Sequence, residues 1–331
     1  MSFWSEKPVF ITGATGFVGY WLTQKLVEKG AFVVALVRDH DPRCELYRSG
    51  LVDRISVVSG SLESYETLER ALSEYEIETV FHLAAQTIVG TAKKAPLITF
   101  EANIRGTYHL LEACRRQRAT VQSIVVASSD KAYGTSAVLP YTENMPLVGS
   151  YPYDVSKSCC DLITQSYFHT YRLPITIARC GNIFGGGDMN WSRLIPGTIK
   201  SLLKGESPIV RSDGTFIRDY IYVKDVVEAY ITLAENAHKQ GIQGEGFNFA
   251  PSKPHTVLEI IYSLQKLMNC THLAPVIQNQ ASGEIKDQFL NSQRAQDRLQ
   301  WFPSYTFEEG LRETIEWYQT YLNSQNAYAP C

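Results

Sequence analysis

The segment PVFITGATGFVGYWLTQKLVEKG, residues Pro8–Gly30, decides the fold. It begins with a short apolar run, Pro8–Thr12, that predicts a buried strand, and apolar residues at helical spacing then continue to Gly30. Glycines at the junction follow the pattern G-x-x-G-x-x-G. Glycines between a strand and a helix let the backbone turn tightly and approach a ligand closely, and the free N–H groups of the new helix attract phosphate. The segment therefore predicts a strand, a dinucleotide-binding turn and a helix.

Further apolar runs alternate with amphipathic segments along the first half of the chain. Predicted strands cover Phe32–Val37, Ile55–Val58, Thr79–Leu83, Ile124–Ala127 and Ile175–Ala178. Predicted helices cover Leu62–Tyr75, Thr99–Arg116 and a segment from Tyr153 to about Tyr171. Because parallel strands need crossover connections, this alternation indicates a parallel sheet with helices on both faces. The predicted fold class is α/β, with a Rossmann-type, doubly wound parallel sheet in residues 1–180.

The second half of the chain changes in character. Residues 181–324 predict a smaller mixed α/β domain that binds the substrate and closes over the first, with some segments returning to the sheet. Helices are expected at Val257–Met268 and Phe307–Tyr321. Residues 325–331 are expected to form a tail.

Composition excludes several functional classes. The 331 residues are 44% hydrophobic and 20% charged, as is typical of a soluble globular protein, and the net charge of −3 gives no basic field for nucleic acid or anionic lipid. The seven cysteines are odd in number and lack C-x-x-C spacing, which argues against a disulfide framework and a metal site. The N-terminus shows no apolar stretch long enough for export or anchoring. We expect a cytoplasmic protein with free thiols, without nucleic-acid or membrane partners.

Polar and small residues at the ends of strands indicate a nicotinamide cofactor. An acidic residue after the second strand would bind the ribose hydroxyls of NAD, whereas an arginine would accommodate the 2′-phosphate of NADP. Arg38 followed by Asp39 leaves NAD and NADP both open, and either charge could be a solvated loop residue. Ala84 and Ala85 are small enough to let a dinucleotide lie over the end of the fourth strand. Asn103 is a candidate cofactor residue, with a helix-packing hydrogen bond as the alternative.

The stretch from Ser128 to Lys157 concentrates the candidate catalytic groups. The motif SSDKAYG places hydroxyls, a carboxylate and an amine at the end of the fifth strand. Tyr153 and Lys157 are four residues apart at the start of a helix, so their side chains project from one face. The lysine ammonium favours the phenolate form of the tyrosine, which makes it a usable proton acceptor. A packing tyrosine beside a solvated lysine is the alternative for an isolated Y-x-x-x-K pattern.

Later loops carry groups suited to a phosphorylated substrate. A polar loop after the sixth strand contains Asn182, Asp188, Asn190, Trp191 and Arg193, and such loops hold the ligands of open α/β sheets. Arg211 and Arg218 flank a glycine turn. Guanidinium groups fork onto phosphate oxygens, so a diphosphate would explain this pair, with ion pairs to nearby aspartates as the alternative.

Together these motifs resemble the extended short-chain dehydrogenase/reductases, the NAD-dependent epimerase/dehydratase family that acts on nucleotide-linked sugars. The resemblance covers nearly the whole chain. GATGFVG looks like the cofactor loop of the family, HLAAQ (His82–Gln86) like its fourth-strand motif, and RDYIYVKD (Arg218–Asp225) like its substrate-phosphate segment. The resemblance implies cofactor contacts from Gly13, Thr15, Gly16, Phe17, Val18, Gly19, Arg38, Asp39, Ser61, Leu62, Leu83, Ala84, Ala85, Gln86, Asn103, Tyr153 and Lys157. It implies substrate contacts from Thr87, Ser129, Asn182, Asn190, Arg193, Leu194, Arg211 and Arg218.

Within the family, the triplet Ser129-Asp130-Lys131 is similar to the Thr-Asp-Lys arrangement of CDP-glucose 4,6-dehydratases. Most other 4,6-dehydratases carry a glutamate at the third position. The chain departs from the pattern in three ways. Ser61 stands where the family usually has an aspartate, and Ser129 replaces a threonine. Arg38 resembles a feature of the GDP-mannose 4,6-dehydratases, which use NADP.

The resemblance implies an internal redox cycle that yields a 4-keto-6-deoxy sugar. Tyr153 would take the proton from the sugar O4 while Lys157 supports the phenolate, and Ser129 would hydrogen-bond O4. Asp130 would protonate the departing C6 hydroxyl. Lys131 would either remove the C5 proton or remain charged and stabilise the enolate. The chain's own residues leave these two roles open.

Other functions remain as alternatives at this stage. A GDP-sugar 4,6-dehydratase or a nucleotide-sugar 4-epimerase would share the fold and the Tyr/Lys pair, and a non-catalytic dinucleotide-binding regulator would share the glycine loop. The helices at Thr99–Arg116 and Ser156–Tyr171 carry more apolar surface than one sheet face needs. We therefore also expect a homodimer formed through a four-helix packing.

Overall fold

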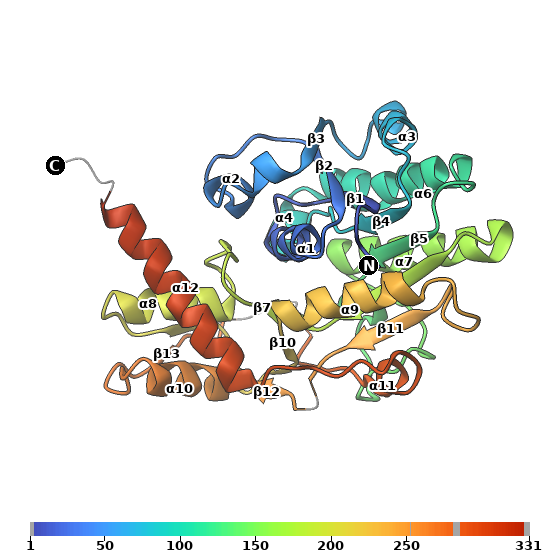
Figure 1. The fold of residues 1–331 in the computed structure, drawn as a ribbon. Helices are drawn as coiled ribbons and strands as arrows, with labels where there is room; N and C mark the ends of the chain where they lie inside the picture. Colours follow the sequence, from blue (N-terminus) through green and yellow to red (C-terminus); the bar gives the residue numbers. More distant parts are fainter. Residues whose placement is uncertain (1–2, 252, 281–284, 328–331) are drawn as a thin grey trace.

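A seven-stranded parallel sheet forms the centre of the computed structural model, which describes residues 3–251, 253–280 and 285–327. The strand order is β3-β2-β1-β4-β5-β6-β11 (Figure 1). The bounds are β1 Pro8–Thr12, β2 Phe32–Val37, β3 Ser56–Ser59, β4 Thr79–His82, β5 Ser123–Ala127, β6 Ile175–Cys180 and β11 Gly246–Phe249. The order reverses between β1 and β4. In open sheets the crevice at such a reversal, beyond the carboxyl ends of the strands, is where ligands bind.

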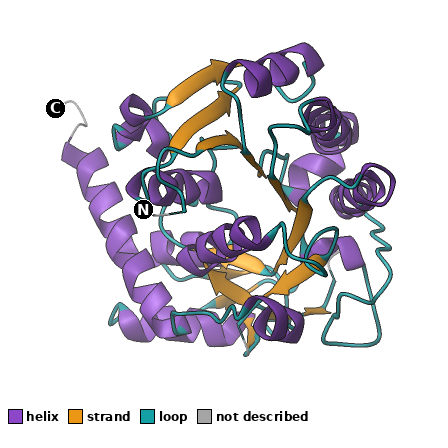
Figure 2. Ribbon diagram, turned by 45° about the vertical axis from the view of Figure 1, so that its right-hand side comes forward, coloured by secondary structure: helices purple, strands orange, loops and turns teal. Residues whose placement is uncertain are grey.

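Helices cover both faces of this sheet (Figure 2). Val9 and Ile11 of β1 point to one hydrophobic core with α1 (Phe17–Glu28) and α9 (Val223–Asn236), while Phe10 points to the other. The opposite face is covered by α3 (Tyr65–Glu74), α6 (Gly106–Arg116) and α7 (Pro152–Tyr171). Alternate residues of a strand point to opposite faces of the sheet. Because helices bury both faces, successive residues are apolar and each strand appears in the sequence as a continuous apolar run. The predicted doubly wound α/β fold is confirmed.

Several element boundaries differ from the sequence expectation. The helix expected at Leu62–Tyr75 begins only at Tyr65, because Leu62 lies in a turn. The single helix expected at Thr99–Arg116 is three pieces: α5 (Pro96–Phe100), a wider π-helical turn η2 (Glu101–Arg105) and α6. Short elements complete this half of the chain: α2 (Glu45–Arg48), η1 (Leu51–Arg54), α4 (Val89–Lys94) and η3 (Asp130–Tyr133).

A third hydrophobic core lies beside the sheet and is formed mainly by α8 (Leu194–Leu203), α10 (Val257–Leu267) and α12 (Phe307–Ala327). Three small sheets accompany it: β7 (Asn182–Phe184) with β10 (Tyr220–Tyr222); β8 (Ile209–Val210) with β13 (Val276–Ile277); and β9 (Ile217–Arg218) between β12 (His255–Thr256) and β14 (Asp287–Gln288). The helix α11 (Gln293–Leu299) packs near β11. Residues 325–327, expected in the tail, belong to α12, and residues 328–331 lie outside the described residues.

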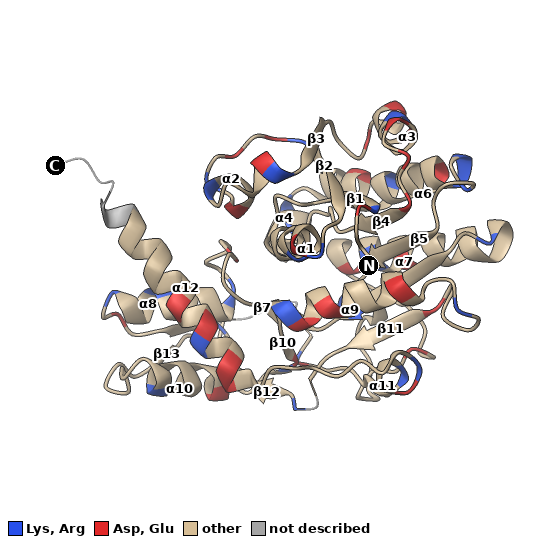
Figure 3. Ribbon diagram, in the orientation of Figure 1, with Lys and Arg blue, Asp and Glu red and all other residues tan. Residues whose placement is uncertain are grey.

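The exposed helices carry charges of both signs. Figure 3 shows acidic and basic residues interspersed along α3 and α12, where Arg70 pairs with Glu74 and Arg312 with Glu308. Among the residues that the structure describes, no helix combines the length and apolar character needed to cross a bilayer.

Candidate active site

A large cavity of about 1530 Å³ opens at the carboxyl ends of the strands. It extends from the loop after β1 to the elements of the third core, including α8 and β8. With the exception of Asn103, every residue predicted from the sequence to contact cofactor or substrate, or to act in catalysis, lines this one cavity. The sequence segments that carry them are distant along the chain, and the strand order brings them together.

The glycine loop fits a phosphate group. Gly13 adopts φ +85°, and a Cβ there would lie 2.8 Å from the backbone nitrogen of Ala84. A Cβ on Gly19 would lie 1.9 Å from the carbonyl oxygen of Gly13. These close approaches require glycine, and α1 begins directly after Gly16, which has no side chain to cap the first N–H groups of the helix. The uncapped helix terminus faces the cavity and is suited to the pyrophosphate of a dinucleotide.

The end of β2 presents both charges that bear on cofactor choice. Arg38 and Asp39 line the cavity and form an ion pair of 2.6 Å with each other, and both side chains are largely exposed. An exposed pair of this kind is weak and can rearrange on binding. The geometry therefore leaves room for ribose hydroxyls at Asp39 and for a 2′-phosphate at Arg38.

A buried histidine aligns the ends of β1 and β4. His82 lies 2.9 Å from the hydroxyl of Thr12 and 3.0 Å from that of Thr107 in α6. Burial, with a smaller effect of Lys157, lowers the pKa of His82 to about 3. His82 is therefore a neutral structural link near the cofactor loop.

Asn103 does not line the cavity. It is buried in η2, its Oδ1 accepts from the backbone N–H of Gln86 at 2.7 Å, and its Nδ2 donates to Gln86 O and to the hydroxyl of Ser156. Asn103 therefore fixes the loop after β4, which carries Ala85 and Gln86, against α7. Its observed contacts match the helix-packing alternative considered for it.

The triplet after β5 forms a short turn, and the hydroxyl of its serine forms hydrogen bonds within the triplet. Ser129 precedes η3, its Oγ accepts from the Lys131 N–H at 3.2 Å and donates to Oδ1 of Asp130 at 3.0 Å. The other carboxyl oxygen of Asp130, Oδ2, is buried and has no hydrogen-bond partner among the described residues. Such an oxygen can accept a hydrogen bond from the hydroxyl of an incoming ligand.

Tyr153 and Lys157 project from the first turns of α7 into the same cavity. Both are almost fully buried in the protein. The Lys157 ammonium donates to the carbonyl oxygen of Ala127 at the end of β5 over 2.8 Å. This contact ties the lysine of α7 to the end of β5.

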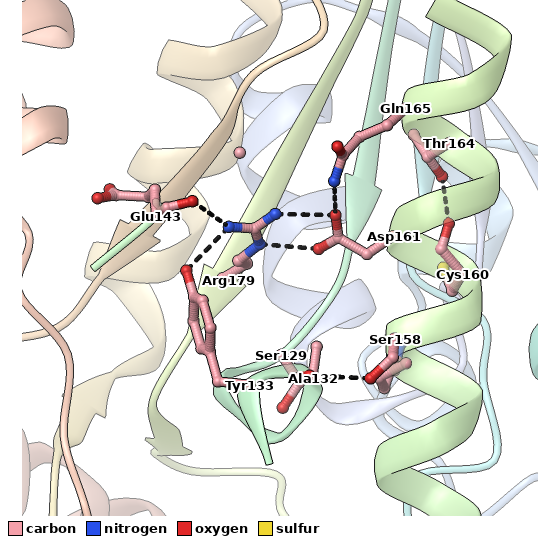
Figure 4. A network of polar contacts seen from close by, with 12 residues as sticks. Ser129, Ala132, Tyr133, Glu143, Ser158, Cys160, Asp161, Thr164, Gln165 and Arg179 are labelled. Carbon is pink, nitrogen blue, oxygen red and sulfur yellow. Dashed lines mark hydrogen bonds and ion pairs between the residues drawn. The ribbon is translucent and has the colours of Figure 1, made fainter. Parts of the chain in front are cut away.

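A buried ionic network holds the two candidate catalytic segments together (Figure 4). Arg179 of β6 forms two hydrogen bonds with Asp161 of α7 and donates to the phenol oxygen of Tyr133, the last residue of η3. Burial disfavours a charged guanidinium, yet Asp161 holds the pKa of Arg179 above its ordinary value. Burial raises the pKa of Tyr133 to about 12. The network therefore joins α7, η3 and the sheet.

Asp154 and Ser128 are two of the cavity residues to which the sequence analysis gave no role. Asp154 is almost fully buried and lines the cavity; burial raises its pKa to about 6, although Lys131 lowers it. The hydroxyl of Ser128 is buried without a partner among the described residues. An acidic residue in the first turn of a helix reads as a capping group, so the sequence pattern gave no separate signal for Asp154.

The substrate side of the cavity carries three arginines, which differ in their ion pairs and hydrogen bonds. Arg193 pairs with Asp188 at 3.0 Å, and Arg211 is exposed at the cavity wall. The Arg218 guanidinium donates to the backbone carbonyls of Ile217, Ile285 and Lys286. Arg218 is therefore partly committed to holding β9 and the segment before β14.

The comparisons with known proteins agree with this geometry. With this fold and this arrangement of the glycine loop and the Tyr/Lys pair, the chain is an extended short-chain dehydrogenase/reductase of the epimerase/dehydratase class. The sequence model described as GDP-mannose 4,6 dehydratase matches residues 10–314, and the chain belongs to this family.

The relatives include several sugar-nucleotide enzymes. A CDP-glucose 4,6-dehydratase of Salmonella typhimurium is 30% identical, with 98% of this chain and 94% of that protein covered. The crystal structure of a Thermotoga maritima UDP-glucose 4-epimerase with UDP-glucose has a TM-score of 0.86 at 28% identity, covering 95% of this chain and 99% of that one. A Bacillus anthracis dTDP-glucose 4,6-dehydratase in complex with NAD has a TM-score of 0.83 at 25% identity, covering 95% and 97%.

Proposed function

We propose that this chain is an NAD-dependent nucleotide-sugar 4,6-dehydratase that acts on a CDP-hexose, with CDP-glucose as the first candidate. The observation that carries the proposal is that Asp130 and Lys131 line the same cavity as Tyr153, Lys157 and the glycine loop. An epimerase needs the Tyr/Lys pair but no acid for a leaving hydroxyl. The 30% identity to a CDP-glucose 4,6-dehydratase supports the choice of nucleotide.

The cavity residues fit the two ends of a nicotinamide dinucleotide. Residues 13–19 would hold the pyrophosphate, Asp39 the adenosine ribose, and Lys157 the nicotinamide ribose. When bound, the nicotinamide would supply a reversible acceptor for the hydride that leaves C4 and returns to C6 after loss of water, so that the cofactor is unchanged over the cycle. The complex of the Bacillus anthracis relative with NAD supports NAD over NADP.

The chain's own residues would move the protons. Tyr153 would accept the O4 proton, with the Lys157 ammonium stabilising its phenolate. Once C4 is a ketone, the C5 proton becomes acidic, and Asp130 would protonate the hydroxyl that leaves C6. Lys131 would act at C5, either as the base or as a charge that stabilises the enolate. Arg193, Arg211, Asn182 and Asn190 would hold the nucleotide diphosphate.

A nucleotide-sugar 4-epimerase is the second candidate, because the Thermotoga maritima epimerase shares the fold over 95% of this chain. The product separates the two functions. We expect the purified protein, incubated with CDP-, GDP-, UDP- and dTDP-hexoses in turn and with NAD or NADP, to release a 4-keto-6-deoxy sugar from CDP-glucose with NAD. Release of a C4 epimer, or of keto sugar from a GDP-hexose alone, would assign one of the alternatives.

We also propose a homodimer, formed by the helical face that α5, α6 and α7 present to solvent. Apolar side chains are exposed there, among them Leu97, Tyr108 and Leu162. Pairing two such faces would bury these residues in a four-helix packing. Sedimentation at micromolar concentration should give twice the chain mass, and Leu162→Glu should give the monomer. A wild-type monomer would refute the dimer.

The compartment that we propose is the cytoplasm. The six described cysteines are unpaired, which supports a reducing environment.

A further inference from the structure

A glutamine far along the chain contacts the amine of the catalytic triplet. The Lys131 Nζ donates a hydrogen bond to Oε1 of Gln288, which lies 157 residues later in β14. Gln288 is fully buried. Nothing in the motifs of the family resemblance points to this residue, because it follows the last of them by more than sixty positions in the chain.

Chemistry fixes the orientation of the Gln288 amide. A lysine amine that carries its proton has only donors to offer, so the amide atom facing it is the oxygen. The Nε2 group then points away, and it is buried without a hydrogen-bond partner among the described residues. A buried N–H without an acceptor is unfavourable. Gln288 thus forms the contact with Lys131 while its own Nε2 group lacks an acceptor. A buried apolar residue would fill the same space without this loss.

The backbone around Gln288 is held on both sides. Gln288 pairs with Arg218 in the parallel strands β14 and β9, and the next residue but one, Leu290, donates its N–H to Asp219. The N–H of Tyr141 donates to the carbonyl oxygen of Phe289. The amide oxygen is therefore presented from a fixed backbone, whereas a lysine has a flexible stem with several rotamers.

The neighbourhood of Lys131 explains why a neutral acceptor matters. Asp154 interacts electrostatically with Lys131, and Asp130 precedes it in the chain. Either carboxylate could draw an ammonium group away from the substrate. An amide oxygen can hold the lysine nitrogen in both its charged and neutral forms, because each form keeps at least one N–H donor.

We infer that Gln288 is a positioning residue that holds the Lys131 amine toward C5 of the hexose during elimination. This inference rests on the proposed dehydratase function. It separates the two halves of the reaction, because Gln288 bonds to Lys131 and forms no hydrogen bond with Tyr153 among the described residues. Oxidation at C4 should therefore be insensitive to Gln288, and chemistry at C5 should depend on it.

The test uses Gln288→Met, which keeps the volume and removes the acceptor. In a single turnover with the hexose that the wild type converts, the absorbance of reduced nicotinamide follows C4 oxidation, and uptake of solvent deuterium at C5 follows the action of the base. We expect oxidation to change less than about twofold and C5 exchange to fall at least about tenfold, the effect of losing one hydrogen bond to a charged group. Equal losses in both steps, or no loss in either, would overturn the inference.

Two further variants complete the experiment. Gln288→Met added to Lys131→Met should lower C5 exchange no further, because residues that act as a unit are not additive; a further loss would contradict the inference. Gln288→Asn withdraws the oxygen but keeps a polar amide, and it replaces the methionine variant if that one does not fold. Gln293→Met is the matched control on the exposed surface nearby. A wild type that forms no keto sugar would refute the dehydratase function itself, and it would do so before any variant is made.

Discussion

The hydroxyl of Ser158 donates to the carbonyl oxygen of Ala132 over 2.8 Å, and this contact fastens α7 to η3. The same hydroxyl accepts the N–H of Gly149 at 3.1 Å. Because α7 carries the tyrosine and lysine pair while η3 carries the aspartate and the second lysine, a single buried hydroxyl helps to set the spacing between the two halves of the proposed machinery. This spacing decides whether both can reach one sugar ring.

Ser158→Ala should therefore lower stability and activity together. The substitution leaves the Gly149 N–H and the Ala132 carbonyl without this partner, and we expect a loss of about 1–3 kcal/mol in the free energy of unfolding. Urea denaturation measures it. Ser166→Ala, on the exposed face of the same helix, is the control and should cost less than about 0.5 kcal/mol. Equal effects of the two substitutions would show that the α7–η3 contact has no special importance.

Tyr153→Phe should abolish the first step of the proposed reaction. Phenylalanine keeps the ring but has no oxygen to accept the O4 proton, and general acid-base catalysis contributes about 10²–10⁴-fold. We expect kcat to fall by this factor, with substrate affinity by calorimetry within about threefold of the wild type. Tyr171→Phe, at the far end of α7, is the control. Retention of full turnover by Tyr153→Phe would remove the tyrosine from the mechanism.

Asp130→Asn should block the reaction after oxidation at C4. An amide cannot deliver the proton that the leaving hydroxyl needs, while the tyrosine and lysine pair is untouched. We therefore expect reduced nicotinamide to accumulate in stopped-flow traces with release of keto sugar lowered by about 10²-fold or more. Asp53→Asn, an exposed aspartate outside the cavity, provides the comparison. If Asp130→Asn still released product at the wild-type rate, another group must be the acid.

Stability should fall with rising pH because of Asp219. Burial raises the pKa of this carboxyl to about 8, a rise that the N–H of Leu290 opposes and Asp130 reinforces. The folded pKa thus lies above the unfolded value of about 3.9. The folded protein holds the proton more tightly, so this contribution to stability is complete below the unfolded pKa and is lost as pH rises through about 8.

Asp219→Asn removes this titration and can still accept from the Leu290 N–H. The free energy of unfolding should decline between about pH 5 and pH 8 in the wild type and decline less in the variant. Denaturant melts across this range, with Asp53→Asn measured in parallel, give the comparison. Identical slopes for Asp219→Asn and the wild type would place the titrating group elsewhere.

Local sequence patterns were sufficient for the fold class and most of the cavity. The strand-glycine-helix pattern at Pro8–Gly30 and the i, i+4 spacing of Tyr153 and Lys157 depend on neighbours in the chain, and such patterns can be read directly. The sheet order then delivers their side chains to one edge without further information.

Contacts set by tertiary structure could not be predicted in the same way. The π-helical turn that contains Asn103 breaks a segment whose apolar spacing reads as one helix, and the hydrogen bonds of Asn103 to Gln86 and Ser156 depend on contacts between distant parts of the chain. The approach of Gln288 to Lys131 depends on how β14 pairs with β9, and strands of two residues give no periodic signal. Arg218 likewise looks available for phosphate until the backbone carbonyls it binds are seen.

The fate of the hydrogen on C4 tests the central claim most directly. CDP-glucose carrying deuterium at C4 is incubated with the protein and NAD in ordinary water, and the product is examined by NMR. The proposed function predicts a 4-keto-6-deoxy sugar whose methyl group at C6 contains the deuterium that was at C4. A sugar that retains its C6 hydroxyl and carries the deuterium at C4 in inverted configuration would contradict the dehydratase function and establish an epimerase.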